Sequence, residues 1–383
     1  MRYLLLGAGL QGRAIAHDLL RHAEDTTALH LFDRDRDALD ALASWLDDPR
    51  VATTRGDVDD AGRLAPLLDA SDVCVSAVNY WFNDDLTRLA IDHGSHFLDL
   101  GGNNDVVAGQ FAQDTAARAA GVTVIPDCGL APGLAGLLGY HLATSLDDCE
   151  RVRLRVGGLP ADPQPPLGYA LTFAVQGLIN EYIEDCVVLR DGERRLVPGL
   201  SELEALDFPG FGPLEAFQTS GGVSTLPETL AGRVGDLDYK TIRYPGHRDR
   251  IRLLMDLGLT ASEPVEIGGV AVHPRDVLAA CLERTLPAGG DDLILLLAEA
   301  EGRLDGRRVR RRIRMVDRRD PETGLTAMMR MTGFPVAVVA HLLASGGVDA
   351  PGARPQETVV PAERMLDELA RRGIDAEREE ADL

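Results

Sequence analysis

The first turn of the chain carries glycines at a spacing that binds phosphates. A Gly-x-Gly-x-x-Gly pattern begins at Gly7, directly after the apolar run 3–6, and a segment with helical periodicity follows it. In such a turn the first glycine allows the bend, the second lets the backbone approach a pyrophosphate, and the third lets the helix pack against the strand. The N-terminus of that helix attracts phosphate through its dipole. The sequence therefore predicts a dinucleotide site, with the turn formed by Gly7, Gly9, Leu10, Gln11 and Gly12.

An acidic residue at the end of the next strand supports this site. Asp33 follows the apolar strand 29–32 and lies 21 residues after Gly12. A carboxylate at this place binds the free hydroxyls of the adenine ribose and repels a 2′-phosphate. We therefore expect NAD as the cofactor, with Arg34 close enough to reduce that preference in part. The other predicted cofactor contacts follow the third and fourth strands and are Asp57, Val58, Ala77 and Val78.

The chain also offers three candidates for proton transfer. Lys240 is the only lysine among 39 basic residues. Burial can bring the pKa of an ammonium near neutrality, so that it transfers a proton, which a guanidinium cannot do. We therefore predict a catalytic role for Lys240, although the survival of one lysine by chance on a strand is the alternative. Asp99 and Asp127, at the carboxyl edge of the predicted sheet, are the other candidates.

Two charged side chains are candidates for binding a substrate. Arg243 is a candidate clamp for a carboxylate. Because side chains alternate along a strand, Lys240 and Arg243 point to opposite faces, which argues against their holding the same ligand. Glu181 lies on a predicted helix and either binds a substrate amine or faces water. The remaining predicted substrate-binding residues are Tyr239, Tyr244 and Asn103.

Strands and helices alternate through about residue 128, which predicts a parallel sheet. Six strands are expected, the number of a complete doubly wound sheet, and ligands bind outside the carboxyl ends of such strands. Polar side chains that follow the strands should therefore meet at one edge. The six predicted strands are 3–6, 29–32, 51–54, 73–77, 97–100 and 122–126.

The pattern changes after residue 130 and predicts a second, α+β domain over 131–332. Hairpins are expected around Asp191-Gly192 and Asp305-Gly306. The periodicity of apolar residues also predicts a helix over 167–183. The third segment, 333–383, is predicted to return as helices that start at Pro335 and Pro361 and pack back on the first domain. Its last residues, 377–383, read as a frayed and solvated tail.

Composition excludes several classes of protein. The formal charge of −22 over 383 residues disfavours nucleic acid and anionic membranes as partners. Five scattered cysteines indicate reduced thiols in a cytoplasm, and no spacing of ligands predicts a metal site. Cys128 is expected to be a small buried side chain in preference to a nucleophile. We find no targeting segment before Gly7 and no apolar run that we expect to span a bilayer.

Several longer motifs together resemble the saccharopine dehydrogenase-like family, most closely its lysine 6-dehydrogenase branch. The most specific stretches are Cys128–Gly133 (CGLAPG) and Tyr239–His247 (YKTIRYPGH). The resemblance implies a Rossmann domain, 1–130, with an inserted catalytic domain, and homodimers or larger homo-oligomers. Saccharopine-forming relatives usually have an acidic residue in a GLDPG stretch, where this chain has Ala131, and this departure favours the lysine 6-dehydrogenase branch.

The resemblance implies hydride transfer at a carbon that bears nitrogen. The expected reaction is NAD-dependent oxidation of the ε-amine of L-lysine to 2-aminoadipate 6-semialdehyde, which cyclises, with release of ammonia. One alternative is a saccharopine-type or carboxyspermidine-type reductase that acts on a larger imine. Another is a protein without catalytic activity that binds NAD as a redox sensor.

Overall fold

The computed structural model describes residues 1–172, 174–287 and 289–383. Contacts within the chain define two compact units, each assembled from two segments. Unit 1 comprises Met1–His141 and Met329–Asp375, and unit 2 comprises Leu142–Met328 and Ala376–Leu383. The predicted third segment, 333–383, is therefore divided, because its last eight residues belong to unit 2.

Unit 1 is built on a seven-stranded parallel sheet with the order β17-β6-β5-β4-β1-β2-β3. The doubly wound α/β fold predicted from the sequence is confirmed, and a short strand from the end of the chain adds a seventh member. The order reverses at β1, which pairs with β2 on one side and β4 on the other. Ligands bind at such a reversal. The strands are β1 (Arg2–Leu6), β2 (Ala28–Asp33), β3 (Val51–Arg55), β4 (Val73–Ser76), β5 (His96–Asp99), β6 (Thr123–Ile125) and β17 (Gly352–Ala353).

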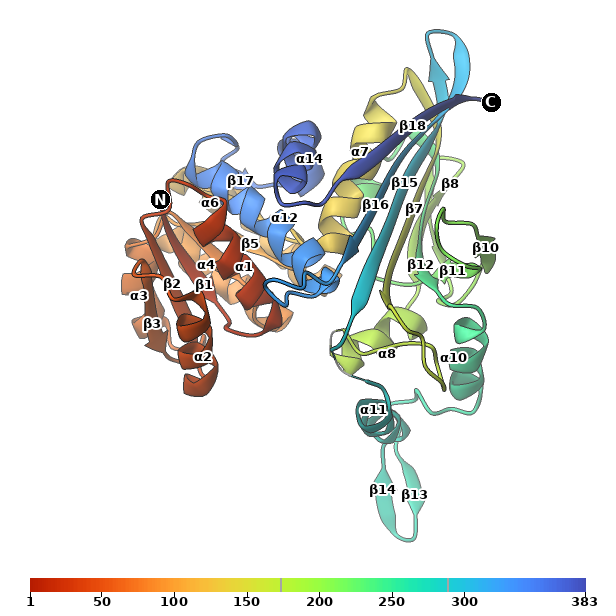
Figure 1. Cartoon of the computed structure of the whole chain (residues 1–383), viewed down its shortest axis with the longest axis horizontal. Coiled ribbons are helices and arrows are strands. Elements are labelled where there is room, and N and C mark those ends of the chain that lie inside the picture. Colours follow the sequence, from red (N-terminus) through yellow and green to blue (C-terminus); the bar gives the residue numbers. More distant parts are fainter. Residues whose placement is uncertain (173, 288) are drawn as a thin grey trace. The chain divides into compact units, whose positions relative to one another are not determined.

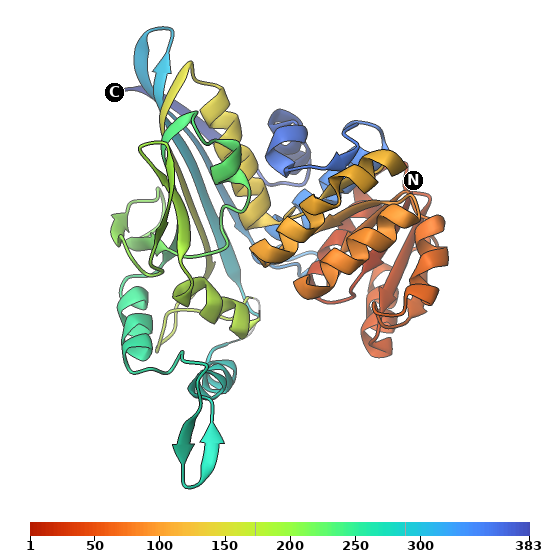
Figure 2. The same cartoon turned by 180° about the vertical axis from the view of Figure 1, so that it is seen from behind.

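Helices cover both faces of this sheet. Figure 1 shows α1 and α12 in front of it, and Figure 2 shows the orange helices, α4 among them, in front of the opposite face. The helices are α1 (Leu10–Arg21), α2 (Arg36–Leu46), α3 (Ala61–Asp69), α4 (Asn83–Asp92), α5 (Asn104–Ala112), α6 (Asp114–Ala120), α13 (Gln356–Val359) and α14 (Ala362–Arg371), with α7 (Ala135–Thr144) and α12 (Ala327–Ala344) running across the unit boundaries.

Helix α12 departs from two expectations. Pro335 lies inside it and does not start it, because the buried apolar side chains on both sides of the proline favour a continuous helix. Contrary to our expectation for the sequence, α12 is long and apolar enough to cross a membrane on length and composition alone. However, 72% of that stretch is buried inside the protein. Gly333 allows close packing within unit 1, since a Cβ there would lie 2.7 Å from that of Ala14.

Unit 2 contains a nine-stranded mixed sheet whose main path is β10-β11-β12-β7-β15-β16-β18, with β8 pairing β12 and β9. Both predicted hairpins are present, as β8–β9 and β15–β16. The strands are β7 (Asp148–Pro160), β8 (Cys186–Arg190), β9 (Glu193–Val197), β10 (Glu204–Leu206), β11 (Leu214–Gln218), β12 (Val234–Arg243), β15 (Asp292–Leu304), β16 (Arg307–Arg318) and β18 (Ala376–Asp382), and a separate hairpin is formed by β13 (Val265–Ile267) and β14 (Val270–Val272).

One helix of unit 2 is shorter than the apolar periodicity suggested. The helix predicted over 167–183 begins only at Val175, because Gly168 has a left-handed φ of 61° and Ala174 is extended. Leu167 and Tyr169 are buried without being helical, which explains the apolar spacing. Phe173, within the predicted helix, lies outside the described residues. The helices are α8 (Val175–Ile183), α9 (Leu226–Thr229), α10 (His247–Asp256) and α11 (Pro274–Thr285).

The last residues form a strand, so the prediction of a frayed tail over 377–383 is wrong. Strand β18 pairs antiparallel with β16 along seven residues. Its carboxylates meet the arginines of β16, with Arg314 and Glu377 2.7 Å apart and Arg311 and Glu380 2.8 Å apart. The acidic run therefore has counter-charges, which lie more than 60 residues earlier in the chain.

Candidate active site

The glycine turn of unit 1 has the geometry of a phosphate cradle. Gly7 has a φ of 103°, and a Cβ there would lie 2.7 Å from the carbonyl oxygen of Ala77. A Cβ on Gly12 would overlap the carbonyl of Gly7, whereas a Cβ on Gly9 would meet nothing within 4 Å. The free space therefore lies at the second glycine, where a pyrophosphate approaches. The first N–H groups of α1 have no partner within the helix and can bind it.

Two further features of the turn fit a dinucleotide. The side-chain Oε1 of Gln11 is buried and has no hydrogen-bond partner among the described residues. Leu10, its neighbour, is 65% exposed at the start of α1. Val58 and Val78 pack against the core of unit 1 below this edge, while Asp57 is exposed.

Asp33 lies at the end of β2, at the rim of the glycine turn. One carboxylate oxygen accepts a hydrogen bond from the backbone N–H of Ala8 at 2.7 Å, and the other accepts from that of Asp35 at 2.8 Å. The side chain remains partly exposed, so it can also accept from ribose hydroxyls. Arg34 is exposed, and its carbonyl accepts from Arg55 at 3.0 Å.

Asp99 and Asp127 are brought together at the carboxyl ends of β5 and β6. Asp99 is fully buried and accepts from Gln110 Nε2 and the N–H of Gly101, both at 2.7 Å, and from the N–H of Asp127 at 3.2 Å. Burial raises the pKa of Asp99, and these hydrogen bonds oppose the shift. Asp127 has a φ of 60° and packs its carboxylate against Gly101. The carboxylate of Asp99 thus connects the loops that follow β5 and β6 by hydrogen bonds.

Two other residues of this edge have defined partners. Asn103 caps α5, because its side-chain oxygen accepts from the N–H groups of Asp105 at 2.9 Å and Val106 at 3.1 Å. Cys128 is fully buried, and burial raises the pKa of its thiol. This agrees with the expected small buried side chain.

Lys240 lies in β12 of unit 2, within a network of ion pairs. Its ammonium donates to Glu204 Oε2 at 2.8 Å and to the carbonyl of Glu202 at 2.7 Å. The same Glu204 accepts from Arg155, which also donates to Asp238 at 2.7 Å. These partners account for the burial of the lysine, and they are the partners that a structural role requires. Whether Lys240 also transfers a proton stays a prediction.

Arg243 projects from the opposite face of β12, as strand alternation predicted. It is 3% exposed, and its Nε donates to the hydroxyl of Tyr182 at 3.3 Å. Its Nη1 donates to the carbonyl of Ile242 at 2.9 Å, and the guanidinium lies 4.7 Å from the ring centroid of Tyr169. Within the part of the chain that the structure describes, no carboxylate oxygen lies within 4.0 Å of it.

The two other buried arginines of the described residues each have carboxylate partners. Arg155 pairs with Glu204 and with Asp238. Arg372, in unit 1, pairs with Asp18 at 2.6 Å and with a second carboxylate, that of Glu368, at 2.7 Å. Isolated buried charges are costly, and proteins normally pair them. Arg243 is the one of these three without such a partner, so its role as a carboxylate clamp stays our prediction.

Glu181 lies near Arg243 on α8. Burial raises the pKa of Glu181 to about 7, opposed by the positive charge of Arg243. Its carboxylate has no hydrogen bond within the described ranges. Tyr239 is also close to Glu181, because burial and the charge of Glu181 both raise the pKa of the Tyr239 hydroxyl. Tyr244 lies apart, because its hydroxyl donates to the carbonyl of Pro160 at 2.9 Å and its ring packs with the core beneath Ile242.

Tyr182 and Tyr169 were missed by the sequence analysis as site residues. Both lie within the helix predicted over 167–183, and their residue types alone predict no contact with a substrate. No local signal could have identified them, since their partner Arg243 lies 61 and 74 residues further along the chain. Unit 1 likewise places Tyr80 at the end of β4, where its ring packs on Gly102.

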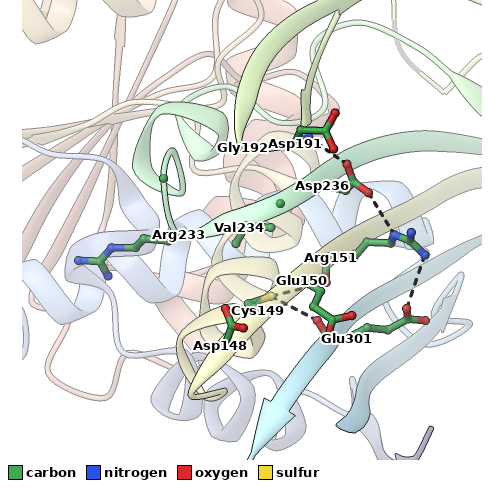
Figure 3. A pocket seen from close by; sticks show the side chains of 12 residues that line it. Asp148, Cys149, Glu150, Arg151, Asp191, Gly192, Arg233, Val234, Asp236 and Glu301 are labelled. Atoms are coloured by element: carbon green, nitrogen blue, oxygen red, sulfur yellow. Dashed lines mark hydrogen bonds and ion pairs between the residues drawn. The ribbon is translucent and has the colours of Figure 1, made fainter.

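A separate cavity of about 640 Å³ lies in unit 2 at the beginning of β7 and β12. Figure 3 shows Arg151 between Asp236 and Glu301, with ion-pair distances of 3.6 Å and 3.5 Å. Val234, in its lining, and Arg243 occupy the first and last positions of the ten-residue strand β12. These ends are about 30 Å apart in an extended strand. The cavity is therefore distinct from the site around Arg243.

Comparisons with known proteins define the family of this chain. Residues 3–125 match the family model of the saccharopine dehydrogenase NADP binding domain, and residues 129–374 match that of the saccharopine dehydrogenase C-terminal domain. The chain belongs to the saccharopine dehydrogenase family, as its motifs suggested. Members of this family are oxidoreductases that act on CH–NH groups, so the protein is an enzyme of this kind.

The relatives align along nearly the whole chain. Saccharopine dehydrogenase [NADP(+), L-glutamate-forming] of Schizosaccharomyces pombe is 22% identical, over 98% of each protein. The apo structure of the L-Glu-forming saccharopine dehydrogenase of Saccharomyces cerevisiae has a TM-score of 0.81 with 20% identity and covers 99% of each chain. Homospermidine synthase of Legionella pneumophila, solved with NAD, has a TM-score of 0.69 with 12% identity, covering 100% of this chain and 92% of the other. These structural similarities confirm the fold.

We predict that Lys240→Arg will lower kcat/KM for the amine substrate by at least about a hundredfold if Lys240 transfers a proton, because arginine keeps the charge but does not titrate. NADH affinity should then hardly change, whereas the thermal midpoint should fall in either case, because the larger guanidinium crowds the buried ion pair with Glu204. Steady-state kinetics and thermal unfolding measure the two effects. A variant with activity close to that of the parent and a lower thermal midpoint would contradict the catalytic role and leave the ion-pair role.

Proposed function

We propose that this protein uses NAD to oxidise the ε-amine of L-lysine to an imine, which water hydrolyses to ammonia and 2-aminoadipate 6-semialdehyde. The semialdehyde then cyclises to piperideine-6-carboxylate. The observation that carries this proposal is the buried guanidinium of Arg243, which has no carboxylate partner among the described residues and lies close to Glu181. A ligand carboxylate that pairs with such a cation offsets the cost of burying it. The substrate should therefore carry a carboxylate.

Glu181 supplies the second part of the recognition. Its ionised carboxylate would accept hydrogen bonds from the α-ammonium, which in an amino acid is next to the α-carboxylate. Arg243 and Glu181 would thus hold the two charges of the substrate. Tyr239 and the ring of Tyr169 offer apolar surface and hydroxyl groups around them. This arrangement leaves the ε-amine of lysine as the group that reacts.

The amine must lose a proton before a hydride can leave its carbon. Asp127, at the carboxyl end of β6, and Asp99, whose carboxylate accepts from Gln110 and from two backbone N–H groups, are our candidates for the base. Lys240 is ion-paired with Glu204. NAD, when bound, accepts the hydride, and the turn at Gly9 and the first N–H groups of α1 would hold its pyrophosphate.

A second candidate function is reduction of a larger imine, as in a saccharopine-type or carboxyspermidine-type enzyme. The name of the relative that aligns along nearly the whole chain, the saccharopine dehydrogenase of Schizosaccharomyces pombe, favours it. Ala131 favours lysine oxidation instead, because this position is acidic in the saccharopine-forming pattern. Family membership argues against a redox sensor without catalytic activity.

We predict that the purified protein will form NADH with L-lysine and release about one ammonia per NADH. The assay should include saccharopine, other amino acids and polyamines as a panel. Arg243→Lys should raise the KM for lysine strongly, since it replaces a bidentate fork by a point charge. Faster turnover of saccharopine or of a carboxylated polyamine, without release of ammonia, would contradict the proposal and support the reductase.

The cofactor preference gives a second test. We predict a higher kcat/KM with NAD than with NADP, because Asp33 would repel a 2′-phosphate. Asp33→Ala should narrow this preference and also weaken NAD binding, since the carboxylate holds the N–H of Ala8. Asp40→Ala, which removes an exposed carboxylate of α2, is the control. Equal or better kinetics with NADP in the parent protein would refute NAD as the physiological cofactor.

A third test uses the pKa of Glu181. Because this pKa is about 7 in the folded protein, the carboxyl is neutral at lower pH and ionised at higher pH. The KM for lysine should fall as the pH rises through about 7, and Glu181→Gln should remove this dependence. Glu283→Gln, at an exposed position of α11 that is not among the charges acting on Glu181, should preserve it. An unchanged pH profile in Glu181→Gln would show that another group titrates.

A further inference from the structure

Arg243 is the end of a chain of buried hydrogen bonds. Its Nε lies 3.3 Å from the hydroxyl oxygen of Tyr182, which lies 2.9 Å from Nε2 of His247. The Nδ1 of His247 lies 3.1 Å from the carbonyl oxygen of Leu167. All three side chains are at least 97% buried. The chain therefore runs through the interior of unit 2, from a backbone carbonyl to the guanidinium.

The direction of every hydrogen bond in this chain follows from its two ends. The carbonyl of Leu167 can only accept, so Nδ1 of His247 carries the proton and donates. Burial, aided by the charge of Arg243, lowers the pKa of His247 to about 3, so the ring is neutral and Nε2 is an acceptor. The hydroxyl of Tyr182 must then donate to His247, and the oxygen of the same hydroxyl accepts from Arg243.

This arrangement fixes which N–H groups of Arg243 remain available. Nε is bound to Tyr182, and one proton of Nη1 is directed to the carbonyl of Ile242. The second proton of Nη1 and both protons of Nη2 have no hydrogen-bond acceptor in the described part of the chain. They lie at the terminal fork of the guanidinium, which is the edge that binds a carboxylate with two parallel hydrogen bonds.

We propose that Tyr182 and His247 are positioning residues that orient Arg243 for the carboxylate of the substrate and so select carboxylated amines over simple amines. The proposal rests on the proposed function, in which Arg243 binds that carboxylate. Neither residue needs to touch the substrate. Ring packing supports their fixed positions, since His247 lies 5.5 Å from Tyr169 and 6.4 Å from Phe217 between ring centroids.

A purely structural role would predict a different result from a positioning role. If Tyr182 and His247 only filled the core, their replacement by rings of similar size would change stability, and any loss of affinity would be the same for all ligands. If they orient Arg243, the loss is confined to ligands that carry a carboxylate. The ratio of the two affinities therefore separates the roles.

The experiment measures binding of two probes to the NAD-saturated full-length protein by calorimetry. L-Norleucine has the carboxylate and α-amine of lysine but no ε-amine, and 1,5-diaminopentane lacks the carboxylate. Tyr182→Phe should weaken norleucine binding by about tenfold, the effect of losing one hydrogen bond to a charged group, and leave diaminopentane binding unchanged. His247→Phe, which keeps an aromatic ring but removes the acceptor, should give the same selective loss. If Tyr182→Phe does not fold, His247→Phe still tests the proposal.

Tyr3→Phe is the matched control. Tyr3, in β1 of unit 1, is also a buried tyrosine whose hydroxyl oxygen lies close to a histidine nitrogen, at 3.4 Å from Nδ1 of His341. This variant should bind both probes as the parent does. Equal weakening of both probes, or no change in Tyr182→Phe and His247→Phe, would overturn the proposal, as would a parent protein that does not bind norleucine.

Binding is independent of turnover, so the two proposals can fail separately. Selective loss of norleucine in a protein that does not oxidise lysine would support the positioning role and refute the proposed reaction. Lysine oxidation with unchanged norleucine binding in both variants would support the reaction and refute the positioning role.

Discussion

The burial of Arg243 without a protein carboxylate is the constraint that organises one face of unit 2. The groups in direct contact with this cation are neutral, namely the hydroxyl of Tyr182, the carbonyl of Ile242 and the ring face of Tyr169, while the charge of Glu181 acts on it without a hydrogen bond. Hydrogen bonds and a cation–π contact reduce the cost of desolvation but do not remove it. A carboxylate ligand would remove more of it, so its binding should also stabilise the folded protein. Recognition and stability are thus coupled at this residue.

Strand β12 separates two systems of charge because its side chains alternate between faces. Lys240 and Asp238 point to one face, where Lys240 lies opposite Arg155 in the register with β7. Two cations so close require carboxylates, and Glu204 serves both. On the other face, Arg243 has no carboxylate within 4.0 Å among the described residues. The same strand therefore carries a closed network of ion pairs and a buried cation that lies outside it. Since the network already contains Arg155, the compact ammonium of Lys240 fits where a second guanidinium would crowd the shared carboxylate.

The sequence predicted the features that depend on neighbours along the chain. The glycine turn, the six strands of unit 1, the two hairpins and the opposite orientation of Lys240 and Arg243 all follow from spacing over a few residues. The features that were missed depend on distant partners. Strand β18 forms because Arg314 and Arg311 lie on β16, and the late start of α8 reflects a turn at Gly168 that apolar periodicity does not reveal. The partners of Arg243 could not be predicted for the same reason, since Tyr182 and His247 meet only in the folded sheet and helix.

Asp33 shows how one carboxylate can link cofactor choice to the geometry of the turn. Its hydrogen bond to the N–H of Ala8 fixes the backbone within the glycine pattern, and its second oxygen holds the N–H of Asp35 at the start of α2. A change of this residue to admit a 2′-phosphate would therefore also release the turn that binds the pyrophosphate. Proteins similar to this chain differ in the cofactor of their names and structures, because the saccharopine dehydrogenase of Schizosaccharomyces pombe is named for NADP(+) and the homospermidine synthase of Legionella pneumophila was solved with NAD. A change of cofactor at this edge would therefore require a second change that restores the turn. The side chain of Arg55 donates to the carbonyl of Arg34 beside Asp33. Cofactor preference at this edge is consequently a property of the acidic residue and its backbone partners together, and not of the acidic residue alone.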